Sequence, residues 1–131
     1  MRYHVKARLK PGRARALKTA IENDTLGRGS VAGDEYLRNM HAARVSDEIV
    51  EWIEVCYCAT PLEEERPYWT TYFDLLSVTD AHDPRACKHR SGINPWTCGV
   101  CHCTWKLERE LETKGEAFLA VSQCSGDFES T

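Results

Sequence analysis

Four cysteines gather in one stretch of the chain and could share a metal ion. Cys98 and Cys101 have the spacing of a chelating turn, in which both sulfurs reach one ion. A structural zinc ion takes four ligands in a tetrahedron, so two more must come from nearby. We therefore predict a zinc site formed by Cys87, Cys98, Cys101 and Cys103, with an iron–sulfur cluster or a reactive dithiol as alternatives.

Several other side chains could replace one of these ligands. Cys103 can join only by a tight local path, because it lies two residues after Cys101. Cys56 and Cys58 lie two apart on a predicted strand and so share one face. We interpret them as small buried apolar residues that could stand in for Cys87 if that face meets the cysteine-rich segment. The possible replacements are His82, His89, His102, Cys56 and Cys58.

Composition restricts the classes of function. The 131 residues suffice for one domain with an appendage, and the formal charge of −3 provides no global field to attract nucleic acid. The N-terminus lacks the apolar core of a secretory signal, and no run is long enough to cross a membrane. We therefore expect a cytoplasmic protein without a membrane or nucleic-acid partner. In that compartment, seven cysteines favour metal binding over a disulfide framework.

The elements that would position these residues can be predicted from periodicity. Residues 3–9 alternate between apolar and polar as in a strand, and residues 14–21 have the apolar spacing of a helix. A short helix over 34–42 should lead into a strand at 43–45, which forms a hairpin with residues 49–58. A helix start at residues 60–63 should open an aromatic helix that reaches Leu76 and is kinked or restarted at Pro67. Residues 77–81 then form a last strand.

This order predicts an α+β fold, a ferredoxin-like βαββαβ antiparallel sheet with helices on one face. The predicted divisions are a core over 1–83, a cysteine-rich metal-binding extension with a C-terminal helix over 84–121, and a flexible tail over 122–131. That helix would begin at Thr104 and end at Gly115. The first and third strands should be antiparallel neighbours, which places Glu51 or Glu54 across from Lys6 or Arg8. The other sheet face, expected to carry Trp52, would be open to a partner.

The residues before position 83 also carry a resemblance. The stretch Gly27–Asp34 together with Thr60–Tyr68 looks like an uncharacterised bacterial family, and the first eighty residues resemble ferredoxin-like domains of the dimeric α+β barrel type. The resemblance implies this topology and a homodimer that pairs sheet to sheet. It implies no activity, because ferredoxin-like domains host unrelated functions.

Three classes of function follow. The first is a cytosolic zinc-binding protein, a non-catalytic dimeric interaction module whose structural zinc shapes a surface for a protein partner. The second is a small enzyme that uses an Asp/His site of Asp80, His82 and Asp83 with His4, in which a carboxylate orients an imidazole base. The third is a thiol or iron–sulfur redox protein that uses the cysteine cluster.

Overall fold

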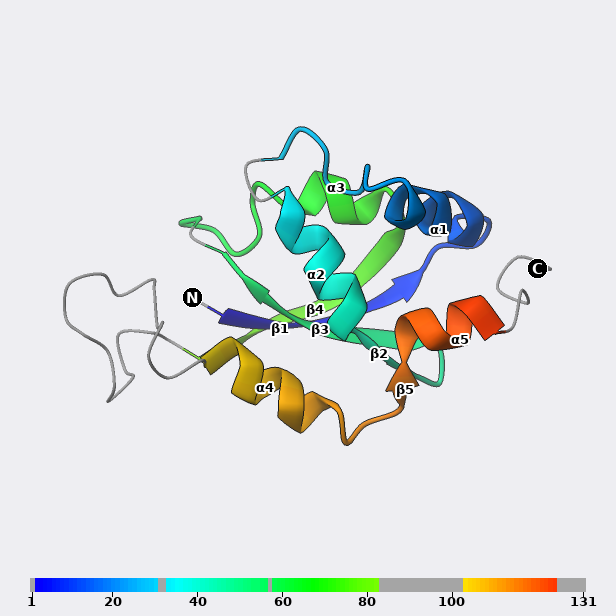
Figure 1. Ribbon diagram of the computed structural model, residues 1–131. Coiled ribbons are helices and arrows are strands. Elements are labelled where there is room, and N and C mark those ends of the chain that lie inside the picture. Colours follow the sequence, from blue (N-terminus) through cyan, green and yellow to red (C-terminus); the bar gives the residue numbers. More distant parts are fainter. Residues whose placement is uncertain (1, 31–32, 57, 83–102, 125–131) are drawn as a thin grey trace.

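The protein is built on one five-stranded antiparallel sheet with the strand order β4-β1-β3-β2-β5 (Figure 1). The computed structural model describes residues 2–30, 33–56, 58–82 and 103–124. Helices α1, α2 and α3 lie on one side of the sheet, and α4 lies on the other (Figure 1). The predicted α+β class with an antiparallel sheet is therefore confirmed. The strands are β1 Arg2–Leu9, β2 Arg44–Ser46, β3 Ile49–Val55, β4 Phe73–His82 and β5 Glu116–Ala117; the helices are α1 Ala14–Glu22, α2 Asp34–Ala42, α3 Arg66–Thr70, α4 Cys103–Leu111 and α5 Phe118–Cys124.

The central pair of strands, β1 and β3, follows the period-two pattern of the sequence. In β1, Tyr3, Val5 and Ala7 are buried on the face toward the core. Val5 lies opposite Trp52, and Lys6 lies opposite Glu51, as expected for antiparallel neighbours. Alternation on two paired strands thus places one apolar row under α1 to α3.

One predicted helix is much shorter than expected. The aromatic segment was expected to remain helical to Leu76, but α3 ends at Thr70 and β4 begins at Phe73. Residues 61–65 form turns and not the helix start expected at 60–63, and α3 begins at Arg66 with Pro67 in its first turn, where proline is tolerated. Leu75 then pairs with Ala7 of β1, so the apolar residues after Thr70 have the period of a strand.

The expectation that Trp52 lies on an open sheet face is wrong. Trp52 is fully buried and packs on Trp69 of α3, with ring centroids 4.6 Å apart. On the opposite face, α4 lies across the sheet (Figure 1), and Leu111 and Ile53 are each 3% exposed. Part of the face assigned to a partner is therefore covered by the chain itself.

The C-terminal part adds two elements that the sequence did not predict. β5 pairs with β2, and the amide of Phe118 donates to the carbonyl of Ala43 at 2.9 Å. Phe118 is 2% exposed, and its ring lies 6.1 Å from that of Phe73. The hydrophobic core is thus completed by a residue beyond position 83. Within the described residues, none of the helices has the length and apolar character needed to cross a membrane.

Candidate metal centre

The predicted zinc ligands fall mostly where the structure gives no description. Cys87, Cys98 and Cys101 lie outside the described residues, as do His89 and His102. Cys103 begins α4, and only its backbone is described. The predicted four-cysteine site therefore stays a prediction.

A different group of metal-ligating side chains lies at the end of β3. Cys56 directly follows this strand, Cys58 comes two residues later, and Glu65 immediately precedes α3. Their potential ligand atoms all lie within 4.8 Å of one another. Among the described residues, this is the group of histidine, cysteine and acidic side chains close enough to hold one metal ion.

Two turns bring Glu65 back to the cysteines. The amide of Glu63 donates to the carbonyl of Thr60 at 3.1 Å, and the amide of Arg66 donates to the carbonyl of Leu62 at 2.8 Å. Leu62 takes the left-handed conformation with a φ of 58°, and its side chain is fully buried. Burial of this apolar side chain offsets the strain of a non-glycine residue there. The reversal places Glu65 beside the cysteine pair.

The distances within the group agree with the edges of a zinc tetrahedron. Zinc–sulfur bonds of about 2.3 Å and zinc–oxygen bonds of about 2.1 Å at tetrahedral angles separate sulfur from oxygen by about 3.6 Å. Glu65 Oε1 lies 3.3 Å from Cys56 Sγ and 3.9 Å from Cys58 Sγ. The three side chains therefore need only small shifts to reach one zinc ion.

Two of the three side chains in this group are buried, and burial disfavours ionisation of the Cys56 thiol. Cys56 is 1% exposed and Glu65 is 4% exposed, whereas Cys58 is partly exposed. Desolvation raises the pKa of the Cys56 thiol to about 12, so the thiol stays protonated at neutral pH when no cation is bound. Of the three side chains in the group, that of Cys58 is the most exposed to solvent.

A second carboxyl, that of Glu54, lies in the same part of the core. It is 2% exposed, and its Oε1 accepts hydrogen bonds from Trp52 Nε1 and Trp69 Nε1, each at 2.8 Å. The pKa of Glu54 is raised to about 7, mainly by burial; the two indole donors act to lower it, and the negative charge of Glu65 acts to raise it. Negative charge is therefore concentrated around the cysteines.

The same acidic groups also affect the pKa of the Tyr36 phenol. Burial raises its pKa well above the usual range, and the carboxylates of Glu64, Glu65 and Glu54 raise it further. Tyr36 donates to Ser30 Oγ at 3.0 Å, and that hydroxyl donates to Glu64 Oε2 at 2.7 Å. A bound cation would offset the mutual repulsion of these acidic groups.

The predicted Asp/His site is brought together only in part. His4 and Asp80 line the same cavity of about 280 Å³, which lies between α4 and the sheet. His4 Nε2 lies 2.8 Å from Glu51 Oε1, so a carboxylate does orient this imidazole, although it is Glu51 that does so. His82 ends β4 with only its backbone described, and Asp83 lies outside the described residues. The catalytic use of this site stays a prediction.

The sequence indicated Cys56 and Cys58 only as possible replacements for Cys87 and favoured their burial as small apolar residues, and it gave no indication of Glu65. The shared face of Cys56 and Cys58 was expected, and Cys56 is indeed buried against the core. The missing signal was the acidic run Glu63-Glu64-Glu65 after a Cys-x-Cys pair at a strand end. Only the turn around Leu62 selects which of these carboxylates faces the sulfurs.

The fold and the site define an α+β protein with a thiol and carboxylate group that could hold a metal ion. No protein-family model, curated protein or solved structure matches the chain. The geometry of this group is therefore the feature of the protein that points to a function.

Proposed function

We propose that this chain is a zinc-binding protein whose metal ion is held by Cys56, Cys58 and Glu65. The observation that carries the proposal is the convergence of two sulfurs and one carboxylate oxygen within 4.8 Å in a buried setting. Two thiolates with one carboxylate suit zinc, a borderline-soft ion, better than they suit magnesium or calcium, which prefer oxygen alone.

The proposed role of the ion is structural: Cys56, Cys58 and Glu65 would supply three of its four ligands, and the fourth must come from outside this group. Cys56 and Cys58 follow β3, while Glu65 precedes α3, so a shared ion would tie the centre of the sheet to a helix that covers it. Zinc would supply the positive charge that this acidic part of the core lacks, and it would displace the thiol proton of Cys56. Such a tie would hold Trp69 of α3 in place on Trp52 of β3.

The proposal is tested by metal stoichiometry. The chain is purified with zinc present, dialysed, and analysed by elemental mass spectrometry. The double variant Cys56→Ser/Cys58→Ser should contain one zinc ion per chain fewer than the unmodified protein. Glu65→Gln should weaken zinc binding by about tenfold or more, because it removes an anionic ligand and keeps the size of the side chain. Unchanged zinc content in the double variant would refute the proposal.

Matched controls separate ligand loss from misfolding. Glu63→Gln alters an exposed carboxylate two residues from Glu65 and should leave zinc binding unchanged. Substitution of cobalt for zinc provides a second measurement, because thiolate ligands of cobalt give charge-transfer absorption in the near-ultraviolet. That absorption should fall by about half or more in Cys58→Ser, whose partly exposed position makes a folding defect a poor explanation. Near-ultraviolet circular dichroism of the stacked tryptophans would show whether each variant retains its core.

We also propose the predicted four-cysteine set as a second zinc site. Its support is the spacing of Cys98 and Cys101 and the helix that begins at Cys103. Cys98→Ser/Cys101→Ser should then lower the zinc content independently of the first double variant. If the two double variants each lose the same single ion, the sets share one site.

The ferredoxin-like topology and the homodimer are proposals of the same kind. The order β4-β1-β3-β2 with antiparallel pairing supports the topology. A dimer is supported by Leu76 of the edge strand β4, an apolar side chain that is 46% exposed. Sedimentation equilibrium should show a dimer that Leu76→Glu dissociates. A monomer at every concentration would exclude the dimer.

A further inference from the structure

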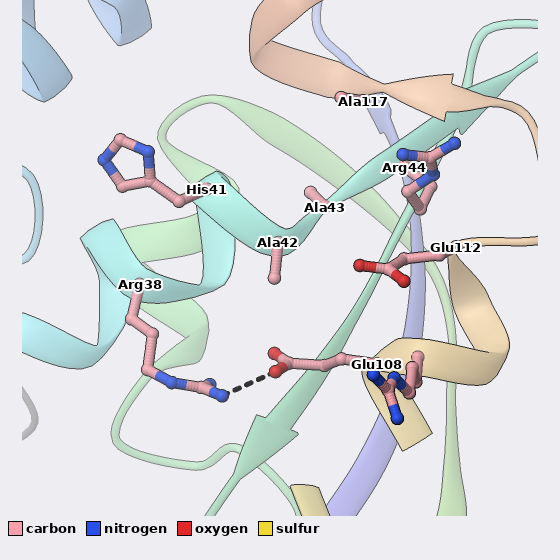
Figure 2. Close-up of a pocket in the computed structure, with 9 residues that line it drawn as sticks. Arg38, His41, Ala42, Ala43, Arg44, Glu108, Glu112 and Ala117 are labelled. Carbon is pink, nitrogen blue, oxygen red and sulfur yellow. Dashed lines mark hydrogen bonds and ion pairs between the residues drawn. The ribbon is translucent and has the colours of Figure 1, made fainter. Parts of the chain in front are cut away.

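A second cavity, separate from the candidate metal centre, lies between α2, β2, α4 and β5 (Figure 2). Its volume is about 340 Å³, which is enough for a small metabolite. Charged side chains from α2 and α4 meet in this cavity, and small apolar side chains form another part of its wall. Neither the metal ligands nor the His4 site contributes to it.

The charged part of the cavity is centred on an ion pair. Arg38 Nη2 of α2 donates to Glu108 Oε1 of α4 at 2.5 Å. The side chain of Glu108 is 9% exposed and that of Arg38 is 42% exposed, so the carboxylate is the buried partner. Glu108 Oε2 is also buried and has no hydrogen-bond partner among the described residues. A buried carboxylate oxygen without a donor is unfavourable, so this oxygen calls for a donor that the described residues do not supply.

A second carboxylate makes that donor a cation. Glu112 lies one helical turn after Glu108, and Figure 2 shows both carboxylates facing the same space beneath Ala42 and Ala43. The pKa of Glu108 is raised mainly by burial, and the negative charge of Glu112 also contributes to raising it. The hydrogen bonds of Arg44 go to the carbonyls of Lys114 and Gly115, at 3.0 and 2.9 Å, and not to these carboxylates. His41 and Arg109 also line the cavity, so a bound ammonium would share it with other basic side chains.

The ion pair itself indicates a ligand with both charges. An ammonium beside Glu108 and Glu112 would leave the guanidinium of Arg38 to face the other end of the ligand. Arg38 uses Nη2 for Glu108, and its planar fork has further donors suited to a carboxylate. The rest of the lining comprises the small residues Ala42, Ala43 and Ala117, which leave room for an apolar side chain, together with His41, Arg44 and Arg109.

We propose that this cavity binds a small zwitterionic amino acid with an apolar side chain. The ammonium is held by Glu108 Oε2 and Glu112, the carboxylate by Arg38, and the side chain by the alanine wall. The bound zwitterion lies head to tail against the Arg38–Glu108 pair, so each charge of the ligand meets its opposite. The binding site is independent of the proposed zinc ion.

Binding is tested by isothermal titration calorimetry with three probes of the same carbon skeleton. L-leucine carries both charges, 4-methylpentanoate lacks the ammonium, and 3-methylbutylamine lacks the carboxylate. L-leucine should bind at least tenfold more tightly than either of the other two. Failure of L-leucine to bind at millimolar concentration would overturn the proposal, as would equal binding of the amine or the acid alone.

Variants assign the charges to their partners. Glu112→Gln changes an exposed residue and should weaken L-leucine binding tenfold or more without altering the fold. Arg38→Gln should reduce L-leucine binding and leave the weak binding of 3-methylbutylamine unchanged. Glu22→Gln, an exposed carboxylate at the end of α1, should change neither. Full retention of L-leucine binding by both Glu112→Gln and Arg38→Gln would refute the assignment.

Discussion

The buried carboxyl of Glu54 should make the stability of the fold depend on pH. Its pKa is about 7 in the folded protein against 4.5 for the free carboxyl. One pKa unit is equivalent to about 1.36 kcal/mol, so the difference corresponds to about 3 kcal/mol. Because the folded state holds the proton more tightly, this contribution is complete below pH about 4.5 and is lost as the pH rises through about 7.

The substitution Glu54→Gln should remove this dependence. Glutamine can still offer Oε1 to the indoles of Trp52 and Trp69, and it carries no charge to desolvate. Urea denaturation in the presence of a chelator, from about pH 4 to pH 8.5, measures the free energy of unfolding of both proteins. The free energy of unfolding of the unmodified protein minus that of the variant should fall by about 3 kcal/mol as the pH rises across this range. Glu63→Gln, at an exposed position, should produce no such trend. A difference that stays constant with pH would refute the reasoning.

Two further predictions concern packing. Gly27→Ala should lower the free energy of unfolding by about 3 kcal/mol or more, because Gly27 has a φ of +75° and the new Cβ would lie 2.2 Å from Tyr36 Cδ2. Gly12→Ala is the control, because Gly12 has a similar φ of +79° but open space around the new Cβ. It should lower the free energy of unfolding by only about 1 kcal/mol, and urea denaturation measures both values. Phe118→Ala should lower the free energy of unfolding by about 3 kcal/mol or more, because it removes a ring that is 2% exposed and packs near Phe73. Thermal unfolding measures this loss. A loss under about 1 kcal/mol would show that α5 does not complete the core.

Strong periodicity made several elements predictable from sequence. The alternation in Arg2–Leu9 identified β1, and the helical spacing identified α1 and the short α2 that leads into β2. The segment after Pro67 was ambiguous, because a short run of aromatic and apolar residues fits either period. Pairing of Phe73 to His82 with β1 decides for a strand, and that is a long-range contact which local sequence does not encode.

The candidate site was predictable only in its local part. Cys56 and Cys58 were expected on one face of a strand over 49–58, but β3 ends at Val55. Their proximity instead arises in the segment after β3, where the amide of Cys58 donates to Cys56 Sγ at 3.3 Å. Glu65 joins them through a turn in which Leu62 takes a left-handed conformation, although leucine gives no local signal for such a turn. The Glu54 site was likewise hidden, because a glutamate in a strand normally indicates a wet face.

The position of Phe118 has a consequence for how the chain folds during synthesis. Residues 2–82 supply four of the five strands, but the core around Phe73 is closed by Phe118, whose amide also donates to Ala43. A nascent chain released only as far as β4 would carry an incomplete core and an unpaired β2 edge. Final closure must therefore wait until residues 116–121 have left the ribosome, and during that interval the protein is most exposed to chaperones and proteases.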